Sequence, residues 1–259
     1  GIPVIAANRI SDPETAERIL ALGQADFIGM GRALIADPQL PNKARTGRIE
    51  EIVPCLACGN CLSDIMVVYK DPHCGAAAGC TVNPSAGRER LHAARPAERV
   101  KRIFVAGGGP AGLQAAATAA ARGHRVTLFE KEAEPGGWMR IACLPPHKED
   151  IATFTRSLAV RAEKAGVRMR FGAALDPRTV EAERPDVLIL AVGAVPIRPD
   201  IPGVDADFVV SAEAVLTGKR AVQGRVVIVG GGLVGCETAA FLKTSAPGVT
   251  DVVVLEMLD

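Results

Sequence analysis

Cysteines are the first residues in this sequence whose type and spacing could do chemistry. Five of the seven lie close together in the stretch CLACGNCLSDIMVVYKDPHCGAAAGC. Cys55, Cys58 and Cys61 form C-x-x-C-x-x-C, a spacing at which three thiolates can wrap one face of an iron–sulfur cluster. Both Cys74 and Cys80 qualify by distance as the fourth ligand. Zinc and disulfides are the alternatives, but no downstream C-x-x-C pair completes a zinc ribbon.

A glycine-rich turn follows further along the chain. Gly107, Gly109 and Gly112 form G-x-G-x-x-G between a strand-like run, RIFVA, and a helix-like run, LQAAATAAARG. The first glycine allows a tight turn, the second lets backbone N–H groups approach a pyrophosphate, and the third lets the helix pack against the strand. Glu130 ends the next strand, where a carboxylate accepts hydrogen bonds from ribose hydroxyls. These features predict a bound dinucleotide rather than a merely structural turn.

The same pattern recurs near the end of the sequence, so the C-terminal half contains an internal repeat. Gly230, Gly232 and Gly235 follow the strand-like run RVVIV, and Glu256 ends the run DVVVLE. A second dinucleotide site is predicted here. Glu256 would repel a 2′-phosphate, and no arginine stands in the three residues after it, which favours NADH over NADPH.

A weaker signal lies near the start of the chain. Asn8 and Arg9 follow one strand-like run, and Gly31 and Arg32 follow the next. In (β/α)8 barrels the loops after the last two strands often build a phosphate site, and backbone N–H groups with an arginine suit the phosphate of FMN. On its own this signal also fits an ordinary turn, in which Arg32 is a solvated surface charge.

The segments that must position these cysteines, glycines and arginines have the sequence pattern of alternating strands and helices. The run IPVIAA, a helix over residues 12–22 and the run ADFIGMGR predict a βαβ unit. Ser11 and Glu14 are expected to form its capping box, and Gly23 to end the helix. The segment 51–99 is expected to hold few periodic elements, whereas strands and helices alternate regularly after it.

Composition narrows the classes of function. An apolar fraction of 48% allows a sizeable core, and a net charge of +1 implies no nucleic-acid or anionic-membrane partner. No apolar run reaches the ~18 residues that a membrane span needs. Cysteines beside cofactor motifs indicate a reducing, cytoplasmic setting. Because both ends of the chain fall on strand-like runs, we expect a piece of a longer polypeptide.

Longer segments resemble known families. EKEAEPGGW and DVLILAVGAVP resemble the FAD segments of glutathione-reductase-like, two-dinucleotide flavoproteins, and GGGLVGCE resembles their nicotinamide-binding segment. The opening sequence, from GIPVIAANRI to LPNKA, resembles the end of the barrel in old yellow enzyme-like flavoproteins. It is most similar to the branch containing 2,4-dienoyl-CoA reductase, enoate reductases and trimethylamine dehydrogenase. Those proteins order an FMN barrel, a four-cysteine 4Fe-4S segment and FAD/NAD(P)H-type domains, and this chain shows the same order.

The resemblance implies an α/β fold class with defined parts. These are the C-terminal βα units of a (β/α)8 barrel, a cysteine-rich Fe-S segment, and Rossmann-like FAD and partial NAD(P)H-binding domains. The implied bounds are 1–50 for the FMN barrel end, 51–99 for the 4Fe-4S segment and linker, 100–222 for the FAD domain and 223–259 for the start of the NAD(P)H domain. The substrate pocket and proton donor of the family belong to barrel strands that precede this sequence, so no catalytic residue is assigned.

The resemblance also implies site residues. Cys80 is preferred to Cys74 as the fourth cluster ligand, because TVNPSAGRE after it is similar to the family's segment; Cys74 is then a spare thiol. Asn8 stands where the family often has glycine, and asparagine tolerates unusual backbone angles. Cys143 and Cys236 are expected to be small core residues. The implied sets are Asn8, Arg9, Gly31 and Arg32 for FMN; Gly107, Gly109, Pro110, Ala111, Gly112, Glu130, Lys131, Gly137, Trp138 and Gly193 for FAD; Gly230, Gly232, Leu233, Val234, Gly235 and Glu256 for NAD(P)H; and Cys55, Cys58, Cys61 and Cys80 for the cluster.

By resemblance, the parent protein is an NAD(P)H-dependent oxidoreductase. Electrons would pass from NAD(P)H to FAD, through the 4Fe-4S cluster to FMN, and then to an activated C=C bond of an enoate, enone or 2,4-dienoyl-CoA. A one-electron carrier bridges two flavins that are too far apart for direct hydride transfer. The alternatives are a trimethylamine-dehydrogenase-like amine dehydrogenase or N-demethylase, and an electron-transfer module that serves a partner protein. The expected partners are a small-molecule substrate and a nicotinamide dinucleotide, and a homo-oligomer is left open.

Overall fold

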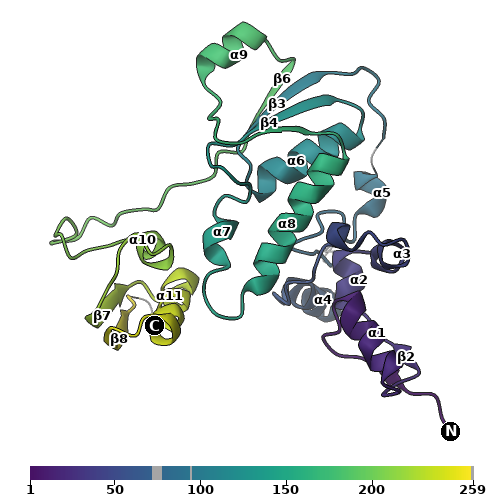
Figure 1. Cartoon of the computed structure of the whole chain (residues 1–259), viewed down its shortest axis with the longest axis horizontal. Helices are drawn as coiled ribbons and strands as arrows, with labels where there is room; N and C mark the ends of the chain where they lie inside the picture. Colours follow the sequence, from purple (N-terminus) through teal and green to yellow (C-terminus); the bar gives the residue numbers. More distant parts are fainter. Residues whose placement is uncertain (72–77, 94, 258–259) are drawn as a thin grey trace.

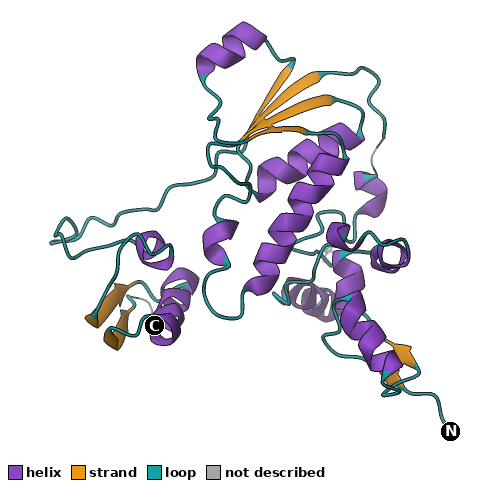
Figure 2. Ribbon diagram, viewed as in Figure 1, coloured by secondary structure: helices purple, strands orange, loops and turns teal. Residues whose placement is uncertain are grey.

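The computed structural model describes residues 1–71, 78–93 and 95–257. In these residues every strand pair is parallel, and the strands form three separate sheets joined by helices and loops (Figures 1 and 2). The predicted mixed α/β architecture is therefore confirmed. In the same residues no helix is both long enough and apolar enough to cross a membrane.

The central sheet carries the first glycine motif. Its strands run in the order β5-β4-β3-β6, and they are β3 (Arg102–Ala106), β4 (Arg125–Phe129), β5 (Arg168–Arg170) and β6 (Val187–Leu190). The chain therefore changes direction across the sheet between β3 and β6. In open parallel sheets, ligands bind beyond the carboxyl ends of the strands at such a switch point. The loops that follow β3 and β6 are thus the place where a dinucleotide is expected.

Two helices build the core against this sheet. α6 (Pro110–Ala121) contacts β3, β4 and α8 (Glu149–Lys164), and its many alanines allow that close approach. Val105, Leu113 and Leu128 are completely buried. The short helices α7 (Met139–Ala142) and α9 (Pro177–Glu183) lie in the connections before and after α8.

The cysteine segment shares this core. Ala36, Val53 and Val82 belong to the same buried hydrophobic cluster as the side chains of the sheet and of α8. Cys55 and Cys80 pack against that cluster from its edge. Burying this apolar surface holds the segment against the central sheet, so the cysteines are not on a free linker.

The N-terminal unit is the predicted βαβ arrangement. β1 (Ile5–Ala6) and β2 (Phe27–Ile28) are parallel, and α1 (Pro13–Ala21) connects them. The predicted capping box of Ser11 and Glu14 is wrong. The N-cap is Asp12, whose Oδ1 accepts a 2.7 Å hydrogen bond from the Thr15 N–H. Gly23 follows the helix with φ +66°, as a left-handed stop residue.

The segment between the N-terminal βαβ unit and β3 is largely helical, and its part from 51 to 99, where we expected few periodic elements, contains α4 (Asn60–Lys70). The apolar residues Leu62, Ile65, Met66 and Tyr69 recur in α4 at the spacing of one helix face, and all four are exposed. The elements here are α2 (Arg32–Ala36), α3 (Leu40–Arg45), the 3-10 helix η1 (Ile49–Glu51), α4 (Asn60–Lys70) and α5 (Glu89–His92).

A buried carboxylate fixes the junction between α2, α3 and the cysteine segment. Asp37 is only 4% exposed. Its Oδ2 accepts hydrogen bonds from Lys43 Nζ at 2.6 Å and from the Val53 N–H at 2.9 Å. Its Oδ1 accepts one from the Gln39 N–H at 3.0 Å. Buried charges persist where they are paired and hydrogen-bonded in this way.

The second glycine motif lies on a smaller unit. β7 (Gly224–Val229) and β8 (Val249–Leu255) form a two-stranded parallel sheet, with α10 (Ala212–Leu216) before β7 and α11 (Leu233–Ser245) between the strands. A long connection, residues 191–211, leads to this unit from the central sheet without regular structure (Figure 1). Lys148, just before α8, forms an ion pair with Glu237 of α11, so the two units are also linked by side chains.

Candidate cofactor sites

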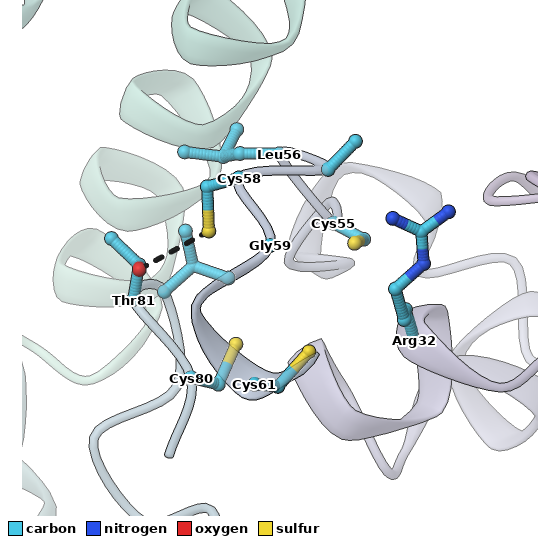
Figure 3. A pocket seen from close by; sticks show the side chains of 10 residues that line it. Arg32, Cys55, Leu56, Cys58, Gly59, Cys61, Cys80 and Thr81 are labelled. Atoms are coloured by element: carbon cyan, nitrogen blue, oxygen red, sulfur yellow. Dashed lines mark hydrogen bonds between the residues drawn. The ribbon is translucent and has the colours of Figure 1, made fainter. Parts of the chain in front are cut away.

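The predicted cluster ligands meet at one hollow. Cys55, Cys58, Cys61 and Cys80 all line it, and Figure 3 shows their sulfur atoms around a common space. All four are free thiols. Cys74, the alternative fourth ligand, lies outside the described residues. The structure thus brings Cys80 to the three closely spaced cysteines although it stands well beyond them in sequence.

Left-handed backbone angles shape the loop that carries these cysteines. Ala57 has φ +51° and Gly59 has φ +78°. Positive φ is uncommon for alanine and persists where surrounding structure holds it, often at functional sites. Gly59 is the N-cap of α4, which places Cys61 in the first turn of that helix, where it is buried. These turns on both sides of Cys58 let the spaced cysteines share one hollow.

The donor set consists of four thiols, the ligand type that iron–sulfur clusters take and that zinc also accepts. Among the described residues no group of three or more His, Cys, Asp or Glu side chains is arranged to hold one ion. Zinc would need its sulfurs about 2.3 Å from a single point. In a 4Fe-4S cluster each cysteine thiolate binds a different iron, so the four cysteine sulfurs lie further from one another than they do around a single zinc ion. The four thiols line one common hollow, so their chemistry is compatible with a cluster of this kind.

The surroundings of Cys58 favour its thiolate, which is the ligand form. Burial acts to raise the pKa of Cys58. Hydrogen bonds from the Thr81 hydroxyl and from the backbone around Asn60, together with the positive charge of Arg32, outweigh burial and lower that pKa below its ordinary value. Thr81 Oγ1 lies 3.2 Å from Cys58 Sγ.

Arg32 lies where the sequence did not lead us to expect it. It lines the cysteine hollow at the start of α2 (Figure 3). Asn8 and Arg9, which follow β1, have φ +91° and +53°. The φ of Asn8 is of the unusual, positive kind that asparagine tolerates better than most residues. The role of these residues and of Gly31 in holding the phosphate of FMN stays a prediction.

The first glycine motif has the close approaches that a dinucleotide loop needs. Gly107 has φ +106°, and a Cβ there would lie 2.2 Å from the Ala191 carbonyl oxygen. A Cβ on Gly112 would lie 1.9 Å from the Gly107 carbonyl oxygen. A Cβ on Gly109 would meet nothing within 4 Å. Packing thus requires the first and third glycines, whereas the second faces open space, as a pyrophosphate-binding loop needs.

Glu130 is tied to this loop through a residue that the motif does not include. Its carboxylate is 5% exposed, and its Oε2 accepts a 2.6 Å hydrogen bond from the Gly108 N–H. Oε1 accepts a second one, of 2.9 Å, from the Glu132 N–H. We did not predict Gly108 as a site residue, although the run GGG, present in both motifs, was a signal for it.

Two further predicted FAD segments reach the same loop. Gly137 (φ +52°) approaches so closely that a Cβ on it would lie 3.2 Å from the Gly109 Cα. Trp138 donates a 2.9 Å hydrogen bond from its indole N–H to the Ala194 carbonyl, and Gly193 lies beside its ring. The loops after β3, β4 and β6 therefore meet at the switch point of the sheet. Of the remaining predicted residues, Pro110 and Ala111 begin α6, and Lys131 lies exposed beside Glu132.

The second glycine motif repeats this geometry on the smaller unit. Gly230 has φ +106°, and a Cβ on Gly235 would lie 1.9 Å from the Gly230 carbonyl oxygen. Gly232 again faces open space, with nothing within 4 Å of its Cβ position. The Gly231 N–H donates a 2.7 Å hydrogen bond to Glu256 Oε2. Leu233 and Val234 begin α11 and are exposed.

The two isolated cysteines lie in different surroundings. Cys236 is exposed rather than buried in a core, and its thiol donates a hydrogen bond to the Gly231 carbonyl. Cys143 is half-buried and donates one to the Arg140 carbonyl. The core assignment is therefore wrong for Cys236. That residue stands in the first turn of α11, which the small unit leaves open.

Two protein families match the chain one after the other. Residues 1–51 match the NADH:flavin oxidoreductase / NADH oxidase family. Residues 101–259, more than half of the chain, match the pyridine nucleotide-disulphide oxidoreductase family. The second match contains both glycine motifs, and the cysteine segment lies between the two.

Named relatives are similar over most of this chain. NADH oxidase of Thermoanaerobacter brockii is 44% identical over 263 residues, covering 99% of this chain and 39% of that protein. N,N-dimethylglycine/sarcosine dehydrogenase of Chromohalobacter salexigens is 37% identical over 227 residues, covering 84% and 32%. A solved complex of 2-naphthoyl-CoA reductase with 2-naphthoyl-CoA has a TM-score of 0.88 and 35% identity, covering 96% of this chain and 37% of that one. The chain thus spans less than two fifths of the length of these relatives.

Proposed function

The chain belongs to the pyridine nucleotide-disulphide oxidoreductase family, and its residues 1–51 match the NADH:flavin oxidoreductase / NADH oxidase family; from this premise we propose that it is the electron-carrying part of a flavin and iron–sulfur oxidoreductase. The observation that supports this most is the cysteine hollow. Its four thiols come from two segments, and two of them pack against the core of the central sheet.

Three groups would be held by residues whose geometry is described above. Cys55, Cys58, Cys61 and Cys80 would ligate a 4Fe-4S cluster. The loop from Gly107 to Gly112 would bind the pyrophosphate of FAD, and the loop from Gly230 to Gly235 that of NAD(P)H. When bound, these groups and FMN would supply carriers for electron pairs at the nicotinamide and flavins and for single electrons at the cluster. The corresponding domains are 1–50, 51–99, 100–222 and 223–259.

We place the entry of electrons at the nicotinamide and their exit at an activated C=C bond. The geometry of the second glycine motif, complete with Glu256, supports nicotinamide use. The names of two similar proteins, an NADH oxidase and a 2-naphthoyl-CoA reductase, support this direction. The match of residues 1–51 to a flavin oxidoreductase family argues against an electron-transfer module that has no substrate site of its own.

The reverse direction is the second candidate. The similarity to N,N-dimethylglycine/sarcosine dehydrogenase favours it, because that relative is named for oxidising N-methyl amines. An enzyme of this kind would take electrons from an amine at FMN and pass them outward. Two assays on the anaerobically purified protein separate the candidates: NADH oxidation with an enone or enoyl-CoA as acceptor, and reduction of a dye with a methylated amine as donor. Activity in the second assay alone would overturn the proposed direction.

Cluster content is the direct test of the site itself. We expect iron and acid-labile sulfide in near-equal amounts in the protein expressed from its complete gene. Cys80→Ser should lose the cluster, whereas Cys143→Ser, a half-buried cysteine outside the hollow, should keep it. Stoichiometric zinc without sulfide would contradict the cluster assignment. A cluster retained in Cys80→Ser but lost in Cys74→Ser would show that the fourth ligand is wrong.

A further inference from the structure

Thr81 is a polar residue that lines the cysteine hollow, and its side chain contacts Cys58, one of the proposed cluster ligands. Thr81 Oγ1 lies 3.2 Å from Cys58 Sγ, at hydrogen-bond distance. Thr81 directly follows Cys80, so this bond joins the segment of the fourth cysteine to the loop of the other three. Figure 3 shows the two side chains next to one another at one edge of the hollow, joined by this contact.

Cys58 is the cysteine that most needs such a partner. It is exposed, whereas Cys61 is buried and Cys55 and Cys80 are intermediate. Ala57 and Gly59 on either side of it have left-handed angles, so no helix or strand holds it in place. A hydrogen bond from another segment limits the positions that its sulfur can take.

The direction of this bond follows from the chemistry of the ligand. In the free thiol either atom can donate. A cysteine bound to iron is a thiolate and has no proton, so the threonine hydroxyl must then be the donor. Hydrogen bonds to the sulfurs of an iron–sulfur cluster help to set its reduction potential. Reduction adds negative charge to the cluster and its thiolates. A hydrogen-bond donor therefore stabilises the reduced state more than the oxidised state.

We propose that Thr81 is a positioning residue that donates a hydrogen bond to the ligand sulfur of Cys58 and thereby raises the reduction potential of the cluster. This inference rests on the proposed function, because it requires the cluster to be present. Thr81 makes the cluster easier to reduce by the flavin on the FAD side and holds the exposed ligand in place.

The experiment compares two variants of the protein expressed from its complete gene. Thr81→Val replaces the hydroxyl by a methyl group at nearly constant shape, whereas Thr81→Ser keeps the hydroxyl and removes the methyl. An anaerobic redox titration followed by the EPR signal of the reduced cluster gives the potential of each. In Thr81→Val we expect the equilibrium constant for reduction to fall about tenfold, a shift of about 59 mV to more negative potential for one electron. Thr81→Ser should stay near the wild-type value.

Every outcome bears on the inference. Equal potentials in wild type and Thr81→Val, with full iron and sulfide in both, would overturn it while leaving the proposed function intact. A wild-type protein without sulfide would overturn both. If Thr81→Val fails to keep its cluster, retention in Thr81→Ser supports the positioning role of the hydroxyl. Loss of the cluster in Thr81→Ser as well would assign the effect to packing and contradict the inference.

Discussion

The backbone N–H of Gly108 and the carboxylate of Glu130 are joined by a 2.6 Å hydrogen bond. The smaller unit repeats the pair, with 2.7 Å between the Gly231 nitrogen and Glu256 Oε2. In each unit the acid that would bind a ribose is therefore held by the loop that would bind the pyrophosphate. Neither Gly108 nor Gly231 can bear a side chain without displacing its acid, because a Cβ would lie 2.9 Å from an atom of that acid in both cases.

We predict that alanine at Gly108 and at Gly109 has different effects, although the two are neighbours. Gly108→Ala should lower both FAD affinity and the stability of the protein without FAD, by about 1–3 kcal/mol for the latter, because its Cβ meets Glu130. Gly109→Ala should lower FAD affinity with little effect on stability, since its Cβ enters open space. Flavin fluorescence titration and thermal unfolding of the FAD-depleted protein measure the two quantities.

The matched pair also tests where the pyrophosphate lies. If Gly109→Ala binds FAD as tightly as wild type, the open space at this glycine is not the pyrophosphate site. If Gly108→Ala has wild-type stability, the contact with Glu130 does not constrain the loop.

Charge at Glu256 is predicted to set the nicotinamide preference. Glu256→Gln keeps the size of the side chain but removes the charge that repels a 2′-phosphate. The ratio of NADPH to NADH dissociation constants should fall about tenfold, equivalent to about 1.4 kcal/mol. Asp251→Asn is the control, because Asp251 is an exposed acid of β8 paired with Arg225. An equal change in both variants would mean that general charge, and not the position of Glu256, decides the preference.

The glycine motifs could be predicted from sequence because their constraints are local. Gly107, Gly109 and Gly112 act through a strand, a turn and a helix that are consecutive in the chain, so spacing alone carries the geometry. The contact of Gly108 with Glu130 joins residues in the loops that follow the adjacent strands β3 and β4, and only the folded sheet shows it.

Other differences have equally physical reasons. The Asp12 carboxylate replaced the predicted Ser11 cap because its backbone is extended and its side chain reaches the Thr15 N–H. The helical spacing of Leu62, Ile65, Met66 and Tyr69 could have indicated α4, which we did not predict. The meeting of Arg32 with the cysteines joins two segments that carry unrelated motifs, so no single motif could indicate it.

Removal of the buried carboxylate at Asp37 should be strongly destabilising. Asp37→Ala leaves Lys43 without its ion-pair partner and the Val53 N–H without its acceptor, which together should cost about 3 kcal/mol. The free energy of unfolding, from denaturant titration followed by circular dichroism, measures this. Asp200→Ala, at an exposed loop position, is the control and should change stability by less than about 0.5 kcal/mol. Similar values for the two variants would mean that Asp37 is not an essential junction.

Acidification should weaken the contact between η1 and α8. The hydrogen bond from Lys164 lowers the pKa of Glu51 most, with burial opposing it and nearby positive charges adding to it. Hydrogen bonds to Glu51 and Glu50 raise the pKa of Lys164. The folded pKa of Glu51 lies below its ordinary 4.5, so its stabilising contribution is complete above pH 4.5 and is lost as the pH falls through the lowered value. The pKa of Lys164 is raised above its ordinary 10.5. The stabilising contribution of Lys164 is therefore complete below pH 10.5 and is lost only as the pH rises through the raised value.

The difference in melting temperature between wild type and Lys164→Met should therefore be constant near neutral pH and shrink below pH 4.5. Its absolute size should be small, since surface ion pairs contribute little, and it should fall further with added salt. Lys243→Met, at an exposed position of α11, is the matched control and should show no such change on the acid side. A difference that stays constant from pH 7 down to pH 3 would contradict the assigned coupling between Lys164 and Glu51.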